Sequence, residues 1–133
     1  MRVSSITALS PKVTPWKDGQ VLTAGNWSAE DYVSDMDFAN VRVIRHYKTE
    51  MVEFVYEFAE EGDWWMGPLS IGWDSMTDKA GTAKLAETVG SSLRISKGLW
   101  INTVGGNPVV WRDVYESDWD RFRSALEAYQ AKM

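Results

Sequence analysis

Apolar and polar residues alternate most clearly between residues 41 and 58, and this period of two predicts a β-hairpin. The apolar positions of its two strands are Val41, Val43, Tyr47, Val52, Phe54, Tyr56 and Phe58. A turn at Thr49-Glu50 puts both apolar sets on one face of the hairpin. Because Thr and Glu are not favoured in a two-residue turn, a longer loop is the alternative.

The same register determines the opposite face of this hairpin. It pairs Arg42 with Glu57 and His46 with Glu53, as oppositely charged neighbours on adjacent strands. Exposed pairs of this kind contribute little to stability, but they favour one register over a slip that would invert both faces. His46 is therefore interpreted as a surface residue. The alternative is a catalytic base oriented by Glu53.

Two stretches in the first ninety residues carry the signals of helices. Ser28 followed by acidic residues is typical of a helix start, and it predicts a helix over residues 29–38. A capping Ser or Thr in residues 75–77 predicts a second helix that ends before Gly90. Gly81 lies inside this second helix and should weaken it by about 1 kcal/mol relative to Ala.

The remaining pattern is less regular. Residues 2–9 read as a weak first strand, and residues 10–27 read as an extended loop or arm that Trp16 and Trp27 hold against the body. Turn-forming Gly and Pro residues bound the later strands, which are predicted over residues 92–96, 99–104 and 109–115.

A last helix is predicted over residues 118–131, because its apolar residues recur every three or four positions. They are Trp119, Phe122, Leu126 and Tyr129. Together these elements indicate a single α+β domain over residues 1–133, with a mainly antiparallel sheet built from hairpins and two to three helices packed on one face.

Composition excludes several classes of function. The chain of 133 residues has no Cys, which excludes disulfides, thiolate catalysis and Cys-based metal sites. A net charge of −5 argues against general binding to nucleic acid or to anionic membranes. No stretch suits a signal peptide or a membrane span. We therefore expect a cytoplasmic, non-enzymatic protein with no cofactor and no metal.

Charge and aromatic residues are distributed unevenly. Between Lys48 and Lys79 there is no Lys, Arg or His, but there are eight acidic residues and three of the eight Trp residues. An acidic turn at residues 60–63 leads into an irregular strand or aromatic loop at residues 64–73. Trp64 and Trp65 are adjacent, so in an extended segment they point to opposite sides, and one should be at least half exposed.

This segment is the candidate interaction surface, because exposed aromatic residues beside carboxylates suit a basic protein partner. The candidate binding residues are Glu57, Glu60, Glu61, Asp63, Trp64, Trp65 and Trp73. An acid pair such as Glu53 and Glu57 could instead serve glycoside hydrolysis or a hard cation, but a solvated strand face explains the same spacing. Gly105-Gly106-Asn107 is interpreted as a hairpin turn, because it lacks the Lys and the following helix of a phosphate-binding loop.

Three functions fit this sequence. The first is a protein-binding module that blocks a basic site on its target. In composition the chain resembles phage-encoded inhibitors of host defence and toxin-immunity proteins, which are also small and acidic. The second is a protein that binds a small ligand or nucleotide in an aromatic pocket. The third is a virion or other assembly subunit, and so a homo-oligomer, in which the arm of residues 10–27 packs on a neighbour.

Overall fold

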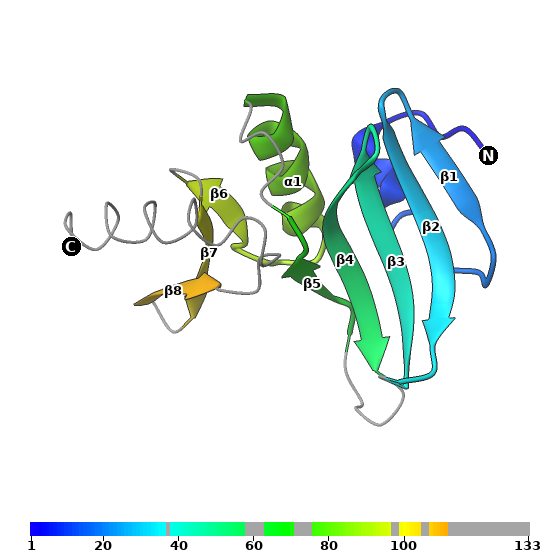
Figure 1. The fold of residues 1–133 in the computed structure, drawn as a ribbon. Coiled ribbons are helices and arrows are strands. Elements are labelled where there is room, and N and C mark those ends of the chain that lie inside the picture. Colours follow the sequence, from blue (N-terminus) through cyan, green and yellow to red (C-terminus); the bar gives the residue numbers. More distant parts are fainter. Residues whose placement is uncertain (37, 58–62, 71–75, 97–98, 105–106, 112–133) are drawn as a thin grey trace.

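The structure, a computed structural model, describes residues 1–36, 38–57, 63–70, 76–96, 99–104 and 107–111. These residues form a five-stranded and a three-stranded antiparallel sheet, one α-helix and one 3-10 helix (Figure 1). In chain order the elements are η1 (Ile6–Leu9), β1 (Val21–Ala24), β2 (Trp27–Ser34), β3 (Ala39–His46), β4 (Thr49–Glu57), β5 (Trp65–Pro68), α1 (Met76–Thr88), β6 (Arg94–Ser96), β7 (Leu99–Val104) and β8 (Asn107–Trp111). The α+β class is confirmed, but the described residues contain one α-helix rather than two or three.

The large sheet has the strand order β1-β2-β3-β4-β5 and two distinct faces. Its inner face packs against η1 and α1. In the view of Figure 1, η1 lies behind the strands and α1 lies beside β4. The inner-face side chains join one apolar core with Leu9, Leu85 and residues of the small sheet. The inner-face members are Leu22, Trp27, Ala29, Ile44, Val52, Phe54 and Met66. We call the opposite side the outer face.

The small sheet has the order β6-β7-β8 and contributes Ile95, Trp100 and Ile101 to the same core. Its first hairpin matches the prediction for residues 92–104. The third strand begins at Asn107, so it includes residues that were expected to form a turn. The predicted helix over residues 118–131 and the C-terminal half of the predicted strand over residues 109–115 lie outside the described residues.

The helix predicted over residues 29–38 is wrong, because residues 27–34 form the second strand of the large sheet. Trp27, Ala29 and Asp31 are buried on its inner face, while Ser28 and Glu30 point to the outer face. The period of two was hidden in the sequence because one of the buried positions is an acidic residue. Its burial is compensated by an ion pair with Arg42.

The β3–β4 hairpin is confirmed, but its predicted register is wrong. His46 pairs with Thr49 across a two-residue turn at Tyr47-Lys48, and Tyr47 adopts a φ of 55°. An irregularity follows between Ile44 and Arg45, so Arg42 lies opposite Phe54 rather than Glu57. The alternation of apolar and polar residues did not predict the register, because both faces of β3 are apolar and its central residue, Arg42, is buried.

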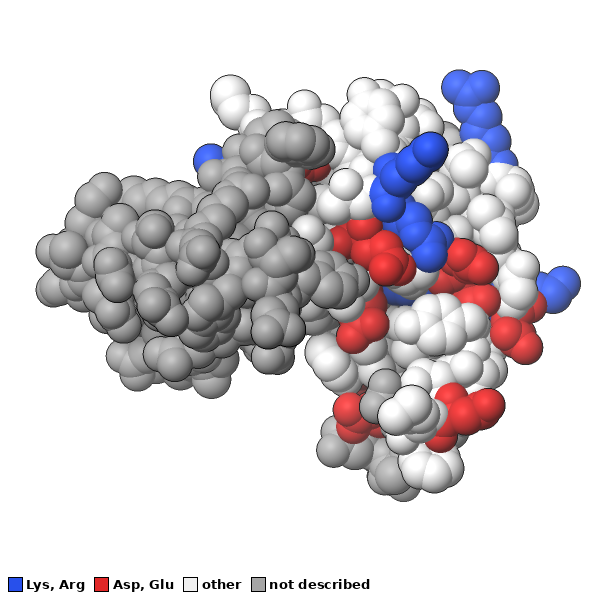
Figure 2. Space-filling view, in the orientation of Figure 1, with Lys and Arg blue, Asp and Glu red and all other residues white. Residues whose placement is uncertain are grey.

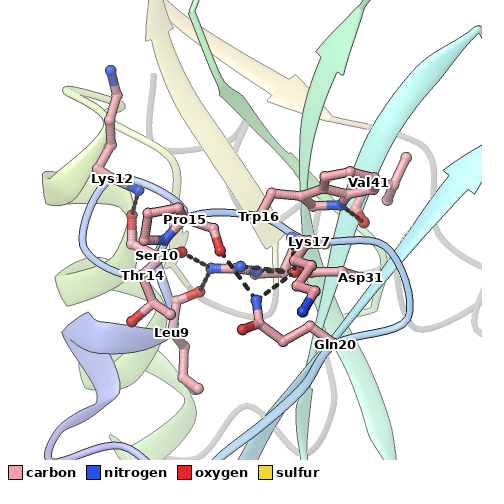
Figure 3. A network of polar contacts seen from close by, with 11 residues as sticks. Leu9, Ser10, Lys12, Thr14, Pro15, Trp16, Lys17, Gln20, Asp31 and Val41 are labelled. Carbon is pink, nitrogen blue, oxygen red and sulfur yellow. Dashed lines mark hydrogen bonds and ion pairs between the residues drawn. The ribbon is translucent and has the colours of Figure 1, made fainter.

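The arm of residues 10–20 is held against the inner face by one buried polar network (Figure 3). Arg42 donates from Nε and Nη2 to the Asp31 carboxylate at 2.6 and 2.8 Å, and both side chains are almost fully buried. Its Nη1 donates to the carbonyl oxygens of Leu9 and Thr14. The Lys17 backbone N–H donates to the same carboxylate.

The N-terminal residues also differ from the expectation of a first strand. Residues Ile6–Leu9 form a 3-10 helix, and Arg2 makes a single parallel bridge with Thr23. As expected, Trp16 and Trp27 fasten this region: the Trp16 indole donates to the Val41 carbonyl oxygen at 3.0 Å, and Trp27 is buried. The predicted arm is therefore part of the body, and its last residues form β1 and the turn into β2.

The second predicted helix is confirmed as α1, and Gly90 follows it with a φ of +66°. Gly81 has a packing role, because a Cβ atom there would lie 2.3 Å from Cζ2 of Trp27 and 2.8 Å from Cδ1 of Ile6. A glycine at this position lets the helix approach the sheet closely. Among the described helices, none is long and apolar enough to span a bilayer.

Candidate functional site

A row of apolar side chains crosses the outer face of the large sheet. Tyr32, Val41, Val55 and Trp65 are direct cross-strand partners from β2, β3, β4 and β5. Partners of this kind point to the same side of a sheet. The two valines are buried, whereas 41% of Tyr32 and 39% of Trp65 is exposed. The row therefore has an aromatic residue at each end, about 14 Å apart for three strand spacings.

Trp65 forms one wall of a depression of about 350 Å³ on this face. The depression is lined by Val41, Glu53, Val55, Glu57 and Trp65. Glu53, Val55 and Glu57 alternate along β4, so both carboxylates emerge on the outer face with the valine between them. The site combines a buried aliphatic floor, one aromatic wall and two acidic residues. We call it the Trp65 depression.

The outer face is acidic. Strands β1 to β5 contain two basic side chains besides His46: Arg42 is buried on the inner face, and Arg45 lies on the outer face. Arg45 is engaged by Glu30 at 3.0 Å and by Glu50 at 3.3 Å. Glu53 and Glu57 add further negative charge beside the Trp65 depression. Figure 2 shows acidic side chains over the strands, with basic side chains among them in the upper part of the view and an uncharged area below.

Of the candidate binding residues, Glu57 and Trp65 lie at this site. Trp64 points the other way, packs against the core and contacts Tyr56, with ring centroids 5.5 Å apart. The opposite orientation of the two indoles is confirmed, although Trp65 is less than half exposed. Glu60, Glu61 and Trp73 lie outside the described residues.

Asp63 is exposed but lies in a local network. Lys12 from the arm forms an ion pair with its carboxylate, and the Trp64 backbone N–H donates to it at 2.8 Å. The Lys12 hydrogen bond is the larger of these effects, and both lower the pKa of Asp63 below its ordinary value of 3.8. This acid therefore connects the arm to the start of β5.

His46 is not paired with Glu53, because the observed register places His46 on the inner face. Its Nδ1 lies 2.5 Å from Oδ1 of Asp78 in α1, and its ring stacks on Trp27 with centroids 4.3 Å apart. Both His46 and Asp78 are largely buried. No hydroxyl group among the described residues is hydrogen-bonded to the His46 ring. Within that part of the chain, His46 and Asp78 therefore lack the nucleophile that would complete a catalytic triad. It joins α1 to β3.

Sequence reasoning missed Tyr32, Val41 and Val55 as members of the outer-face row, of which the two valines also line the Trp65 depression. Tyr32 was assigned to a helix, and Val41 was placed on the core-facing side of its hairpin. The available signal was the alternation of Glu53, Val55 and Glu57, which was read as a solvated face. No group of three or more His, Asp or Glu side chains within the described part of the chain is placed to hold a metal ion.

Comparisons of this chain with protein-family models, with curated proteins and with solved structures found no match.

Proposed function

We propose that this protein is a non-enzymatic binding module that presents the outer face of its large sheet to a basic surface on another protein. The observation that carries this proposal is the Trp65 depression, where a partly exposed indole and two carboxylates surround a buried valine floor. Interfaces favour this combination, because aromatic anchors supply burial and surrounding charges supply complementarity.

The electrostatics of the face support a basic partner. Arg45, the one Lys or Arg that strands β1 to β5 place on the outer face, is engaged by Glu30 and Glu50, and Glu53 and Glu57 line the Trp65 depression on the same face. A face with this excess of negative charge speeds encounter with a positive surface and disfavours nucleic acid. The proposed action is that of an inhibitor or immunity protein in the cytoplasm, as in phage proteins that block host defence: occupation of the target's basic site.

The two alternatives fit the described residues less well. A nucleotide is disfavoured in the Trp65 depression because the two carboxylates that line it repel phosphate groups. An assembly subunit was proposed because its arm could pack on a neighbour. That arm is fastened to its own sheet through Arg42 and Asp31, so the described structure offers no extended segment for exchange within residues 10–27.

A crosslinking experiment tests the proposal by finding the partner through the site itself. A photoreactive p-benzoylphenylalanine at position 65 should capture one dominant protein in cells, and that protein should have a basic patch. The matched control carries the same group at Met76, which is exposed on α1. Capture that is equally strong from both positions would contradict an interface at the outer face.

Variants then separate electrostatic steering by the acidic residues from anchoring by Trp65 in the binding of the captured protein. Glu57→Lys should slow association roughly tenfold and make it less sensitive to salt, because it removes electrostatic steering. Trp65→Ala should raise the dissociation rate and cost about 2 kcal/mol of binding free energy, as an aromatic anchor does. Glu87→Lys makes the same charge change on α1 and should leave both rates near wild type.

These rates are measured by surface plasmon resonance at several salt concentrations. Equal weakening by Glu87→Lys would mean that net charge alone drives binding. Unchanged rates in both Glu57→Lys and Trp65→Ala would refute the proposed function.

A further inference from the structure

We infer that the Trp65 depression is a pocket for a single arginine side chain of the partner, with its guanidinium group stacked on the Trp65 indole. This inference rests on the proposed function and specifies the chemistry that the site selects. It depends on three features of the depression: how the indole is held, where the carboxylates stand and what forms the floor.

Gly67 determines how the indole is held. A Cβ atom on Gly67 would lie 2.8 Å from Cζ3 of Trp65 and 3.7 Å from each of its two ring neighbours, Cε3 and Cη2. The two neighbours are each 0.9 Å farther away than Cζ3, which is the geometry of an approach in the ring plane, so Gly67 meets the edge of the six-membered ring rather than its face. The ring therefore stands with its edge against β5, and Gly67 covers neither of its faces. An aromatic face that borders a depression is the surface on which a cation stacks.

The carboxylates select a positively charged occupant. Glu53 and Glu57 are on the same face of β4, two residues on either side of Val55, and both line the depression. Their Cα atoms are separated by about 13 Å of strand, so their side chains approach an occupant from opposite ends. A long side chain fits this arrangement if its stem lies on Val41 and Val55 and its charged head reaches a carboxylate.

Arginine meets these requirements better than lysine. Its guanidinium group is planar, so it can stack on the indole while its edge still donates hydrogen bonds to a carboxylate. The ammonium group of lysine is compact and strongly hydrated, and it has no flat surface to stack. An aromatic wall combined with acidic ends therefore distinguishes the two cations, whereas carboxylates alone would not.

Short peptides test this selectivity without the natural partner. The probes are acetyl-Gly-Arg-Gly-amide, its Lys counterpart and its citrulline counterpart, which keeps the shape of arginine but lacks its charge. Binding is followed by NMR through the Trp65 indole N–H and the Val55 methyl groups. We expect the Arg peptide to bind about three- to fivefold more tightly than the Lys peptide. The citrulline peptide should show no saturation up to about 10 mM.

Two variants test whether the Trp65 indole and the two carboxylates cause the preference for arginine. Gly67→Ala should displace the indole and abolish the preference for arginine while the NMR spectrum remains that of a folded protein, because the colliding atom is the far end of a side chain. The double variant Glu53→Gln/Glu57→Gln should weaken both cationic peptides. Equal affinity for Arg and Lys peptides, perturbations confined to residues outside the Trp65 depression, or no binding by any peptide would overturn the inference.

The failure of this inference is distinguishable from the failure of the proposed function. If the peptides show no preference but Glu57→Lys and Trp65→Ala still weaken the captured partner, the face binds its target without an arginine pocket. If those two variants leave partner binding unchanged, the proposed function itself fails, whatever the peptides do.

Discussion

At the scale of single residues, Asp63 gives a prediction with a defined sign. Its pKa is lowered mainly by the Lys12 side chain and also by the Trp64 backbone N–H. A carboxylate whose pKa is lower in the folded state stabilises the fold above its ordinary pKa, and this contribution is lost as the pH falls through the folded value. An NMR titration of the Asp63 carboxyl group should therefore give a midpoint below 3.8.

The Lys12→Ala variant should move that midpoint upward, because it removes the larger cause of the shift. The midpoint should not return fully to 3.8, since the Trp64 N–H still donates to the carboxylate. Lys12→Arg keeps the positive charge and serves as the control. A midpoint that ignores Lys12→Ala would show that the ion pair does not form in solution.

Residue-scale reasoning from the sequence worked where the local geometry was simple. The opposite orientation of Trp64 and Trp65 follows from their adjacency in an extended chain, and the structure confirms it. It failed for Arg42, which is fully buried although its type is usually exposed. The partner that makes this burial tolerable, Asp31, is eleven residues away and was assigned to a helix.

At the scale of elements, the β3–β4 hairpin, the β6–β7 hairpin and α1 were predictable because their signals are local: alternation, turn residues and caps. The register between β3 and β4 was not predictable. Strand β3 has apolar residues on both faces, so no difference in polarity shows which face is buried. The second strand was mistaken for a helix for a related reason. Its start resembles a capped helix, and its buried acidic residue conceals the alternation.

Gly81 gives the prediction that belongs to the element scale. In an isolated helix, Gly81→Ala would stabilise by about 1 kcal/mol. In this protein the added methyl group would overlap Trp27 and Ile6, so we expect a net loss of about 1–3 kcal/mol from overpacking. Chemical denaturation followed by circular dichroism measures the difference in the free energy of unfolding.

The control for this prediction is Ala83→Gly, at an exposed position of the same helix. It should cost about 1 kcal/mol through helix propensity alone. A gain of stability in Gly81→Ala would mean that α1 does not pack on Trp27 as closely as the structure indicates.

At the scale of the whole molecule, the outer-face row and the Trp65 depression within it could not be predicted, because their side chains come from four strands. Glu57 and Trp65 were identified from composition, but Tyr32 and Val41 join them only through the pairing of β2, β3 and β4. A wrong helix and a wrong register were sufficient to separate these residues. Long-range pairing, rather than local propensity, decides which side chains share the outer face.

The last prediction concerns how the first twenty residues are fastened to the large sheet. Arg42→Met should destabilise the protein by about 3–5 kcal/mol, because it leaves the Asp31 carboxylate buried without its counter-charge. Adding Asp31→Leu should recover much of this loss, since the double variant buries no charge. Both variants lack the Arg42 hydrogen bonds to the carbonyl oxygens of Leu9 and Thr14, so the arm should stay loosened in both.

Hydrogen exchange separates these two effects. In the double variant the core strands should regain slow exchange, while the Lys17 amide, which donates to Asp31 in the wild type, should remain fast. Slow exchange at Lys17 in the double variant would mean that other contacts hold the arm. If the arm does loosen, the double variant should still bind the captured partner, because Arg42 and Asp31 lie on the opposite face from Trp65. Loss of binding would then show that the arm takes part in the interface, and it would support the alternative function of an assembly subunit.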